Sequence, residues 1–161
     1  MAFEPGNRIG GLDGEEIARF LAEPWNARIG TVTPEGWPYL TPVWYEFERA
    51  GPAFLVVGRE RAEWVGHVRA VPRVALHVAD DVHSQHTRVL VQGTAEIAEG
   101  PIAPSASPSL LELTRRLSIR YLGPNGPSYA ERTIDRPRVL VRITPERWLT
   151  WTGGEWHPRY R

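Results

Sequence analysis

The first apolar pattern along the chain is helical and lies near the N-terminus. Asp13 fits the N-cap position, and Glu16 three residues later completes a capping box. The next apolar positions recur at helical spacing and predict one buried face: Ile17, Phe20 and Leu21. Pro24 ends this helix. Residues 1–11 are rich in glycine and show no periodicity, so we expect an irregular segment there.

From residue 25 onward the hydrophobic period changes to two, which predicts strands. The first three strands are separated by turn sequences and are expected to form an antiparallel meander: 26–33, 37–48 and 53–58. Pro38 and Pro42 place the middle strand at a sheet edge or break it, because proline cannot donate a hydrogen bond to a neighbouring strand.

The second half of the chain mixes strand and helix periods. The expected strands are 74–78, 86–98 and 137–144, the last continuing over 147–152 after Pro145. The expected helices are 62–70, one from Ser107 or Ser109 to Gly123, and 127–133. A loop rich in Pro, Ser and Ala is expected over 99–108. The pattern predicts a mainly-β fold, an antiparallel barrel of roughly six to seven strands with peripheral helices, in a single domain over 1–161.

Composition narrows the possible functions. The chain has 161 residues, with 19 basic and 19 acidic side chains and no long run of one sign, which argues against sequence-independent nucleic-acid binding. All the basic residues are arginine, so lysine Schiff-base chemistry is excluded. The absence of cysteine excludes disulfides, thiolate catalysis and zinc–thiolate sites. No apolar run reaches the length of a membrane span and no signal peptide is recognisable, so we expect a cytoplasmic protein without a membrane partner.

The C-terminal stretch combines aromatic rings with cations. Residues 151–161 hold two indoles, a phenol, an imidazole and two guanidiniums. Large apolar rings are costly to leave in water, so this end should dock on the core or on a partner subunit. Aromatic faces beside fixed cations also suit a planar, anionic ligand.

Three stretches of the chain carry a resemblance to a known family: 36–47, 65–76 and 145–161. The first is a turn and a strand, the second leads a helix into a strand through Pro-Arg-Val, and the third ends in Trp-Thr-Gly-Gly-Glu and the residues after it. Their order and spacing resemble the pyridoxamine 5′-phosphate oxidase-like family, the FMN-binding split β-barrels. The resemblance implies a homodimer, two flavin sites at the subunit interface and a small-molecule substrate.

The resemblance places the FMN phosphate near the entrance of the helix at 62–70. The family's Ser-Arg-Lys falls on 62–64, which is Ala-Glu-Trp here, so the usual basic pair is missing. Arg59 and Arg61 are candidates to replace this pair, because guanidiniums beside a helix N-terminus suit a phosphate. The alternative is that these two arginines are solvated loop charges. The candidate cofactor contacts in this region are Val57, Gly58, Arg59, Arg61 and Trp64.

The second predicted strand also departs from the family. Oxidases place an Arg and a Lys there against the flavin, and these positions are Pro42 and Phe47 in this chain. The intervening residues can still line the ring through backbone and aromatic contacts: Val43, Trp44 and Tyr45. The alternative for Trp44 is a place in the core or at a dimer interface.

Further contacts implied by the resemblance come from the fifth strand and the C-terminus. Arg88 stands where a family Gln reaches the flavin, and a cation there would stabilise negative charge on the reduced ring; the alternative is an arginine at the barrel rim. Trp151 matches a flavin-side Trp, and Arg161 keeps a further Arg near the flavin. The substrate-binding Arg-x-His pair becomes His157 and Arg159. Because this pair is swapped and two flavin ligands are absent, we expect no true pyridoxamine phosphate oxidase activity.

The sequence singles out no catalytic residue, and we expect no metal site. The Asp and His residues in 80–86 lie in a predicted loop and match no metal motif. The leading hypothesis is an FMN-dependent oxidoreductase, with the deazaflavin coenzyme F-420 as the alternative cofactor. The hypothesis from a different class is a non-catalytic flavin-binding protein or a cofactor-free structural dimer.

Overall fold

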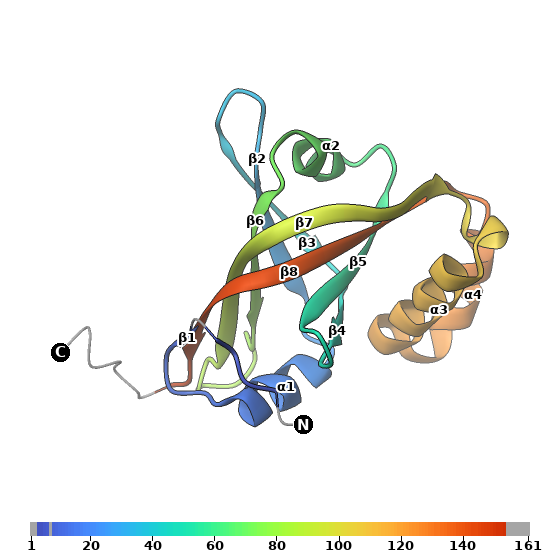
Figure 1. Cartoon of the computed structure of the whole chain (residues 1–161). Coiled ribbons are helices and arrows are strands. Elements are labelled where there is room, and N and C mark those ends of the chain that lie inside the picture. The colour runs from blue at the N-terminus through green and yellow to red at the C-terminus, as the bar shows by residue number, and fades with distance from the viewer. Residues whose placement is uncertain (1–2, 7, 154–161) are drawn as a thin grey trace.

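The computed structural model describes residues 3–6 and 8–153. Its strands form one strongly bent sheet with helices packed around it (Figure 1). The helices are α1 (Gly14–Ala22), α2 (Glu63–Ala70), α3 (Pro108–Leu122) and α4 (Gly126–Arg132), with short 3₁₀ turns at Pro104–Ala106 and Gly123–Asn125. The strands are β1 (Arg8–Ile9), β2 (Ala27–Val32), β3 (Pro38–Val43), β4 (Glu46–Glu48), β5 (Ala53–Arg59), β6 (Arg73–Ala79), β7 (Arg88–Ile102) and β8 (Arg138–Trp151).

The sheet is antiparallel along the order β3-β2-β6-β7-β8-β5-β4, and β1 pairs with β8 in parallel. This confirms the antiparallel split barrel with peripheral helices that the sequence predicts. The expectation that the strand over 37–48 is broken or lies at a sheet edge is confirmed, because it is divided into β3 and β4 at the two ends of this order. Only Trp44 and Tyr45 separate these strands along the chain. Within the described residues β3 and β4 are not hydrogen-bonded to each other, so the barrel is not closed.

Two segments expected to be irregular join the sheet. β7 extends to Ile102, so the loop predicted from residue 99 begins later than expected. Within 1–11, the short strand β1 pairs with Trp148 and Leu149 of β8. A strand of two residues is too short to show a hydrophobic period, which explains why the sequence pattern did not predict it.

A bulge bends the long ribbon formed by β7 and β8. Gln92 lies opposite Arg147, but the next residue, Gly93, lies opposite Pro145, so β8 has one extra residue at this point. Gly93 is required there because a Cβ atom would lie 2.2 Å from the carbonyl oxygen of Thr144. The bulge lets β8 continue past the proline as a single strand.

Alternate residues of the strands fill the barrel interior. Leu76 and Val78 of β6 and Val89 and Val91 of β7 are all buried, as their spacing of two predicts. A cluster of aromatic rings lies among them, with neighbouring centroids 5.0–6.0 Å apart: Phe3, Phe47, Phe54 and Trp148. These rings contribute a large share of the apolar area that folding removes from water.

The predicted N-terminal helix and its cap are confirmed. The Asp13 side chain accepts from the Glu16 N–H, and the Glu16 carboxylate accepts from the Asp13 N–H, both at 2.8 Å. Ile17 and Leu21 are fully buried against the barrel core, and Phe20 packs beside them. α1 therefore covers the end of the barrel next to β1 and β4 (Figure 1).

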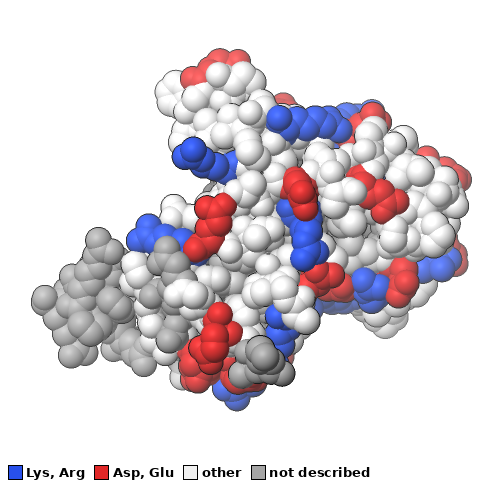
Figure 2. Space-filling view, in the orientation of Figure 1, with Lys and Arg blue, Asp and Glu red and all other residues white. Residues whose placement is uncertain are grey.

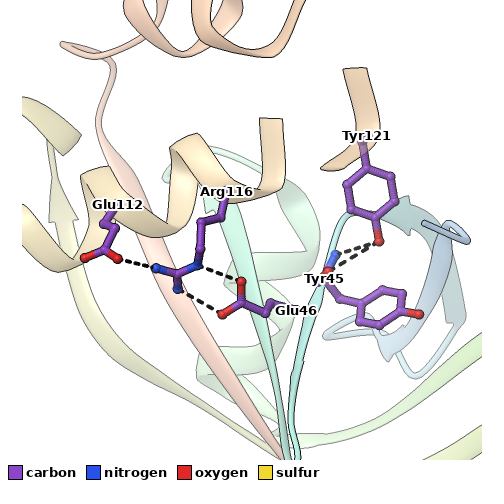
Figure 3. Close-up of polar contacts among 5 residues, drawn as sticks. All are labelled: Tyr45, Glu46, Glu112, Arg116 and Tyr121. Carbon is purple, nitrogen blue, oxygen red and sulfur yellow. Dashed lines mark hydrogen bonds and ion pairs between the residues drawn. The ribbon is translucent and has the colours of Figure 1, made fainter. Parts of the chain in front are cut away.

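The outer face of β5 is buried as well, because α3 packs on it. Phe54 and Val56 face the barrel interior, whereas Leu55 belongs to a second apolar cluster with residues of α3: Leu113 and Leu117. This burial on both faces explains the continuous apolar run at the start of β5. Arg116 of α3 donates to both carboxylate oxygens of Glu46, at 2.8 and 2.9 Å, and to Glu112 at 2.8 Å (Figure 3).

The hydroxyl of Tyr121, near the end of α3, holds the break between β3 and β4. It accepts from the Tyr45 N–H at 3.3 Å and lies 3.3 Å from the Tyr45 carbonyl oxygen (Figure 3). The same hydroxyl donates to the carbonyl oxygen of Trp25 at 3.0 Å. Because Tyr45 lies between two strands, neither of its backbone groups is paired in the sheet. Burial raises the pKa of the Tyr121 hydroxyl, which keeps it protonated and able to donate.

Among the described residues, no helix has both the length and the apolar composition that crossing a membrane requires. On the face drawn in Figure 2, acidic and basic side chains are interspersed without a broad field of one sign. This distribution agrees with the equal numbers of basic and acidic residues, 19 of each.

We expect Tyr121→Phe to lower the free energy of unfolding by about 1–3 kcal/mol, because it leaves the Tyr45 N–H and the Trp25 carbonyl without this partner. Urea denaturation measures the change. Tyr129→Phe is the matched control and should change stability by less than about 0.5 kcal/mol. The Tyr129 hydroxyl makes no hydrogen bond within residues 3–6 and 8–153. An equal loss in both variants would contradict the role of the Tyr121 hydroxyl.

Candidate functional site

One candidate site is a groove of about 550 Å³ at the split of the barrel. It lies between the end of β3, the end of β5, the start of α2 and the helix α4. It is lined by Val43, Trp44, Val57, Gly58, Arg59 and Trp64, all of which the sequence assigned to the cofactor. Its other lining residues are Asn26, Thr41, Pro42, Ala62, Tyr129 and Arg138. The fold thus gathers candidates from two separate stretches of sequence into one groove.

Aromatic rings form the walls of this groove. Trp44 stacks on Tyr121 with ring centroids 5.2 Å apart and an angle of 4° between the planes, and it meets Tyr129 edge-on at 5.7 Å. Trp44 therefore packs against α3 and α4 and also lines the groove. On the opposite wall, Trp64 is buried and lies against Gly58.

Gly58 is needed for this close packing of strand against helix. A Cβ atom at position 58 would lie 2.7 Å from Cζ2 of Trp64 and 2.9 Å from Cγ2 of Val65. Both of these side chains are buried, so they have little room to move. The small residue at position 58 therefore sets how closely α2 approaches β5.

Two arginines face the groove from neighbouring strands. Arg59 ends β5 and Arg138 begins β8, and they are directly opposite in the antiparallel pairing. Arg138 is only 6% exposed, and its Nε and Nη2 atoms are buried and have no hydrogen-bond partner among the described residues. An adjoining groove of about 520 Å³ is lined by Arg59, Glu60, Arg61, Arg136 and Pro137. The predicted pair Arg59 and Arg61 therefore lies beside the aromatic groove.

Sequence reasoning missed Tyr129, Arg136 and Arg138. Arg138 was visible only as the second residue of the strand predicted over 137–144, and Tyr129 as part of a predicted short helix. One signal was available for the arginines, since Arg136-Pro-Arg138 places two cations at a strand entrance. The sequence did not predict the pairing of β8 with β5, so it gave no reason to place Arg136 and Arg138 beside Arg59.

Tyr45, a candidate for ring contact, is not among the residues that line the groove. Its side chain is fully buried in the core, and its hydroxyl donates to the carbonyl oxygen of Leu21 at 3.1 Å. The guanidinium of Arg120 lies 5.1 Å from the ring centroid. Burial raises the pKa of the Tyr45 hydroxyl. The role of Tyr45 in this structure is to anchor the strand break that presents Trp44.

Arg88 and Trp151 form a separate pair. They are directly opposite in the β7–β8 pairing, and the Arg88 guanidinium lies 5.0 Å from the centroid of the Trp151 ring. At the other end of the same ribbon, Ile102 pairs with Arg138. The groove and the Arg88–Trp151 pair therefore lie at opposite ends of β7 and β8. One copy of the chain does not bring them together.

The acidic loop before β7 is held by its own hydrogen bonds. Asp80 accepts from the N–H groups of Val82 and His83 at 2.9 Å and from the His83 ring at 2.7 Å, and Asp81 pairs with Arg28. In the part of the chain that the structure describes, no group of three or more His, Cys, Asp or Glu side chains could hold a metal ion. The candidates His157, Arg159 and Arg161 lie outside the described residues.

Comparison with known families identifies the relationship of the chain. The family described as pyridoxamine 5′-phosphate oxidase matches residues 14–152. The chain belongs to this family. The matched range includes every residue that lines the groove and stops before His157, so family membership rests on the barrel and not on the C-terminal residues. No curated protein matches the chain.

Solved structures with the same fold differ in what their names say they do. A conserved hypothetical protein of Mycobacterium tuberculosis is 25% identical with a TM-score of 0.67, over 88% of this chain and 86% of that one. HutZ, a heme storage protein of Vibrio cholerae, is 17% identical with a TM-score of 0.64, over 86% and 95%. An F420 reductase is 21% identical with a TM-score of 0.59, over 81% and 93%. For the last two, the likeness concerns the fold alone.

We expect Gly58→Ala to lower the free energy of unfolding by about 1–3 kcal/mol, because the new methyl group overpacks the contact with Trp64 and Val65. Gly66→Ala, in the middle of α2, is the control. A Cβ there has no atom within 4 Å, so the better helix propensity of alanine should raise stability by up to about 1 kcal/mol. Thermal and urea unfolding of both variants measure the two changes in stability, a loss for Gly58→Ala and a gain for Gly66→Ala. Destabilisation by Gly66→Ala would contradict this account of α2.

Proposed function

We propose that this member of the pyridoxamine 5′-phosphate oxidase family is an oxidoreductase that binds FMN in the groove at the split of the barrel. The observation that carries the proposal is the convergence of the expected cofactor residues on that groove: Val43, Trp44, Val57, Gly58, Arg59 and Trp64. The proposed enzyme is cytoplasmic, acts on a small-molecule substrate and is not a true pyridoxamine phosphate oxidase.

The residues present fit a flavin. A groove of about 550 Å³ lies within the range of small-molecule sites, and aromatic walls with a few polar groups are typical of them. Trp44 offers apolar surface to a planar ring, Trp64 is buried in the groove wall, and Arg59 offers a cation to the anionic end of the cofactor. When bound, the cofactor supplies hydride or electron transfer, and the protein orients it and excludes water.

The proposed enzyme is a homodimer. The expected ring contact Trp151 lies at the far end of the β7–β8 ribbon from the groove, so a second copy must supply it if both serve one site. In a two-fold dimer the same contact arises twice, which yields two equivalent sites. The β2–β3 hairpin exposes apolar side chains that a subunit contact would cover, with Trp37 71% exposed and Leu40 67% exposed.

A deazaflavin is the alternative cofactor. The adjoining groove places Arg61 and Arg136 next to Arg59, so cations continue beyond the aromatic groove. Coenzyme F-420 has a longer anionic tail than FMN, and such a tail would use these additional cations. The similarity to an F420 reductase supports the same alternative.

A non-catalytic or cofactor-free dimer is the alternative from another class. Its support is the segment 62–64, where Ala-Glu-Trp replaces the family's Ser-Arg-Lys and the Trp64 indole is buried against β5. The fold-level likeness to a heme storage protein also shows that this fold serves proteins of other classes.

Titration of the purified protein with FMN and with F-420, followed by absorbance and fluorescence, tests the proposal. Tight FMN binding with turnover of a reductant supports an FMN enzyme, and preference for F-420 supports the deazaflavin form. Binding without any turnover favours the non-catalytic form, and no binding of either cofactor contradicts the oxidoreductase proposal. We expect Trp151→Ala to weaken cofactor binding about 10-fold, since one aromatic stacking contact is lost; unchanged affinity would remove Trp151 from the site.

Mixing two defective variants tests the shared site. Arg59→Glu damages the groove and Trp151→Ala damages the far end of the ribbon, so each homodimer should bind cofactor weakly. In a dimer of one copy of each, one site combines both defects and the other combines two intact halves. Random pairing after refolding together should therefore restore tight binding at about one quarter of all sites. No recovery in the mixture, or a monomer in analytical ultracentrifugation, would contradict the shared site.

A further inference from the structure

The guanidinium of Arg138 is the most unusual polar group in the described structure. Arg138 is 6% exposed, and within the described residues its guanidinium makes no hydrogen bond or ion pair. The Nε and Nη2 atoms of this guanidinium are buried and have no partner there. An arginine does not lose its proton at any pH that proteins meet, so this is a buried, uncompensated charge. Such a charge is costly unless a partner offsets it.

A second cation increases that cost. Arg59 lies directly opposite Arg138 across the β5–β8 pair, so both side chains leave the sheet on the same face. Like charges at directly opposite positions repel each other. Both arginines line the aromatic groove, which is where an anion between them would be reached from solvent.

The acidic residues nearby do not neutralise this pair. Glu60 lines the adjoining groove and Glu63 begins α2, but neither forms an ion pair with Arg59 or Arg138 within the described part of the chain. The start of α2 adds to the positive potential, because its N-cap, Ala62, has no side chain to accept from the free N–H groups of the first turn. Ala62 lines the same groove.

We propose that Arg138 and Arg59 form a phosphate-binding site at the entrance of β8. Two guanidiniums on adjacent strands match a phosphate, which accepts paired hydrogen bonds from the planar arginine fork and carries up to two charges. The resemblance assigns phosphate binding to residues 62–64, but this chain has Ala-Glu-Trp there in place of the family's Ser-Arg-Lys. In this chain the arginines at the end of β5 and the start of β8 would bind the phosphate instead. The site itself stands on the Arg138–Arg59 pair; only the assignment of the phosphate to a flavin or deazaflavin rests on the proposed function.

The test compares wild type with Arg138→Gln, using inorganic phosphate and pyrophosphate at constant ionic strength. Calorimetric titration and thermal unfolding should show that wild type binds pyrophosphate and is stabilised by it. Arg138→Gln should weaken this binding about 10-fold to 100-fold, because charge-assisted hydrogen bonds are lost. Arg115→Gln, which removes an exposed charge of α3, is the control and should bind as wild type does.

The unliganded stability of Arg138→Gln separates a binding role from a structural one. If Arg138 serves a ligand, removal of its unpaired charge should leave the Tm of the unliganded protein unchanged or higher. A lower Tm together with unchanged pyrophosphate affinity would overturn the proposal, as would a wild type that binds neither phosphate nor pyrophosphate. If Arg138→Gln fails to fold, Arg59→Gln serves as the second variant, because Arg59 is exposed and its substitution does not disturb the core. Arg59→Gln should weaken pyrophosphate binding about 3-fold to 10-fold.

A second comparison identifies the molecule that carries the phosphate. Wild type should bind FMN at least about 10-fold more tightly than riboflavin, and Arg138→Gln should lose this preference while binding riboflavin as before. A preference for FMN that survives Arg138→Gln would overturn the site and leave the proposed function intact. If neither flavin nor F-420 binds, the proposed function fails, and the pyrophosphate titration still decides the site.

Discussion

The structure depends on one break in a strand, held by a single hydroxyl group. Between β3 and β4 the chain leaves one end of the sheet and joins the other, and Tyr45 has no strand partner for its backbone groups. The Tyr121 hydroxyl bonds to them and to the Trp25 carbonyl, which ties α3 to the barrel at this point (Figure 3). Because the break also presents Trp44 to the groove, the same contact that completes the fold shapes the candidate site.

The groove and the charges around it show a division of roles within the fold. The aromatic core and the buried faces of α1 and α3 supply the stability, since they remove large apolar areas from water. Arg138 works against that stability, because its guanidinium is buried without a partner beside Arg59. Groups that cost stability are expected at functional sites, and here the group lies in the wall of the groove.

Much of the fold follows from local patterns in the sequence. The capping box at Asp13 and Glu16 fixes the start of α1, and the alternation in β6 and β7 fixes their buried faces. The prolines of this segment predict a break or an edge, but the place of the break after Val43 could not be predicted, because Trp44 and Tyr45 continue an apolar strand pattern. The hydroxyl that bonds to the Tyr45 backbone lies 76 residues away in the sequence. The bulge at Gly93 has the same origin, since the carbonyl that requires glycine belongs to Thr144 on another strand.

For the candidate site, the sequence by itself determined which local segments carry suitable chemistry: 43–45, 57–64 and Trp151, through their rings, cations and likeness to a family. Only the tertiary structure decided that Val43, Trp44 and Trp64 share a groove, that Tyr45 belongs to the core and that Trp151 lies at the far end of the β7–β8 ribbon. It also placed Arg138 opposite Arg59. The physical reason is that the spacing of apolar residues along the sequence indicates which face of a helix or strand is buried. Strand pairing across the sheet decides which residues that are distant in the sequence become neighbours.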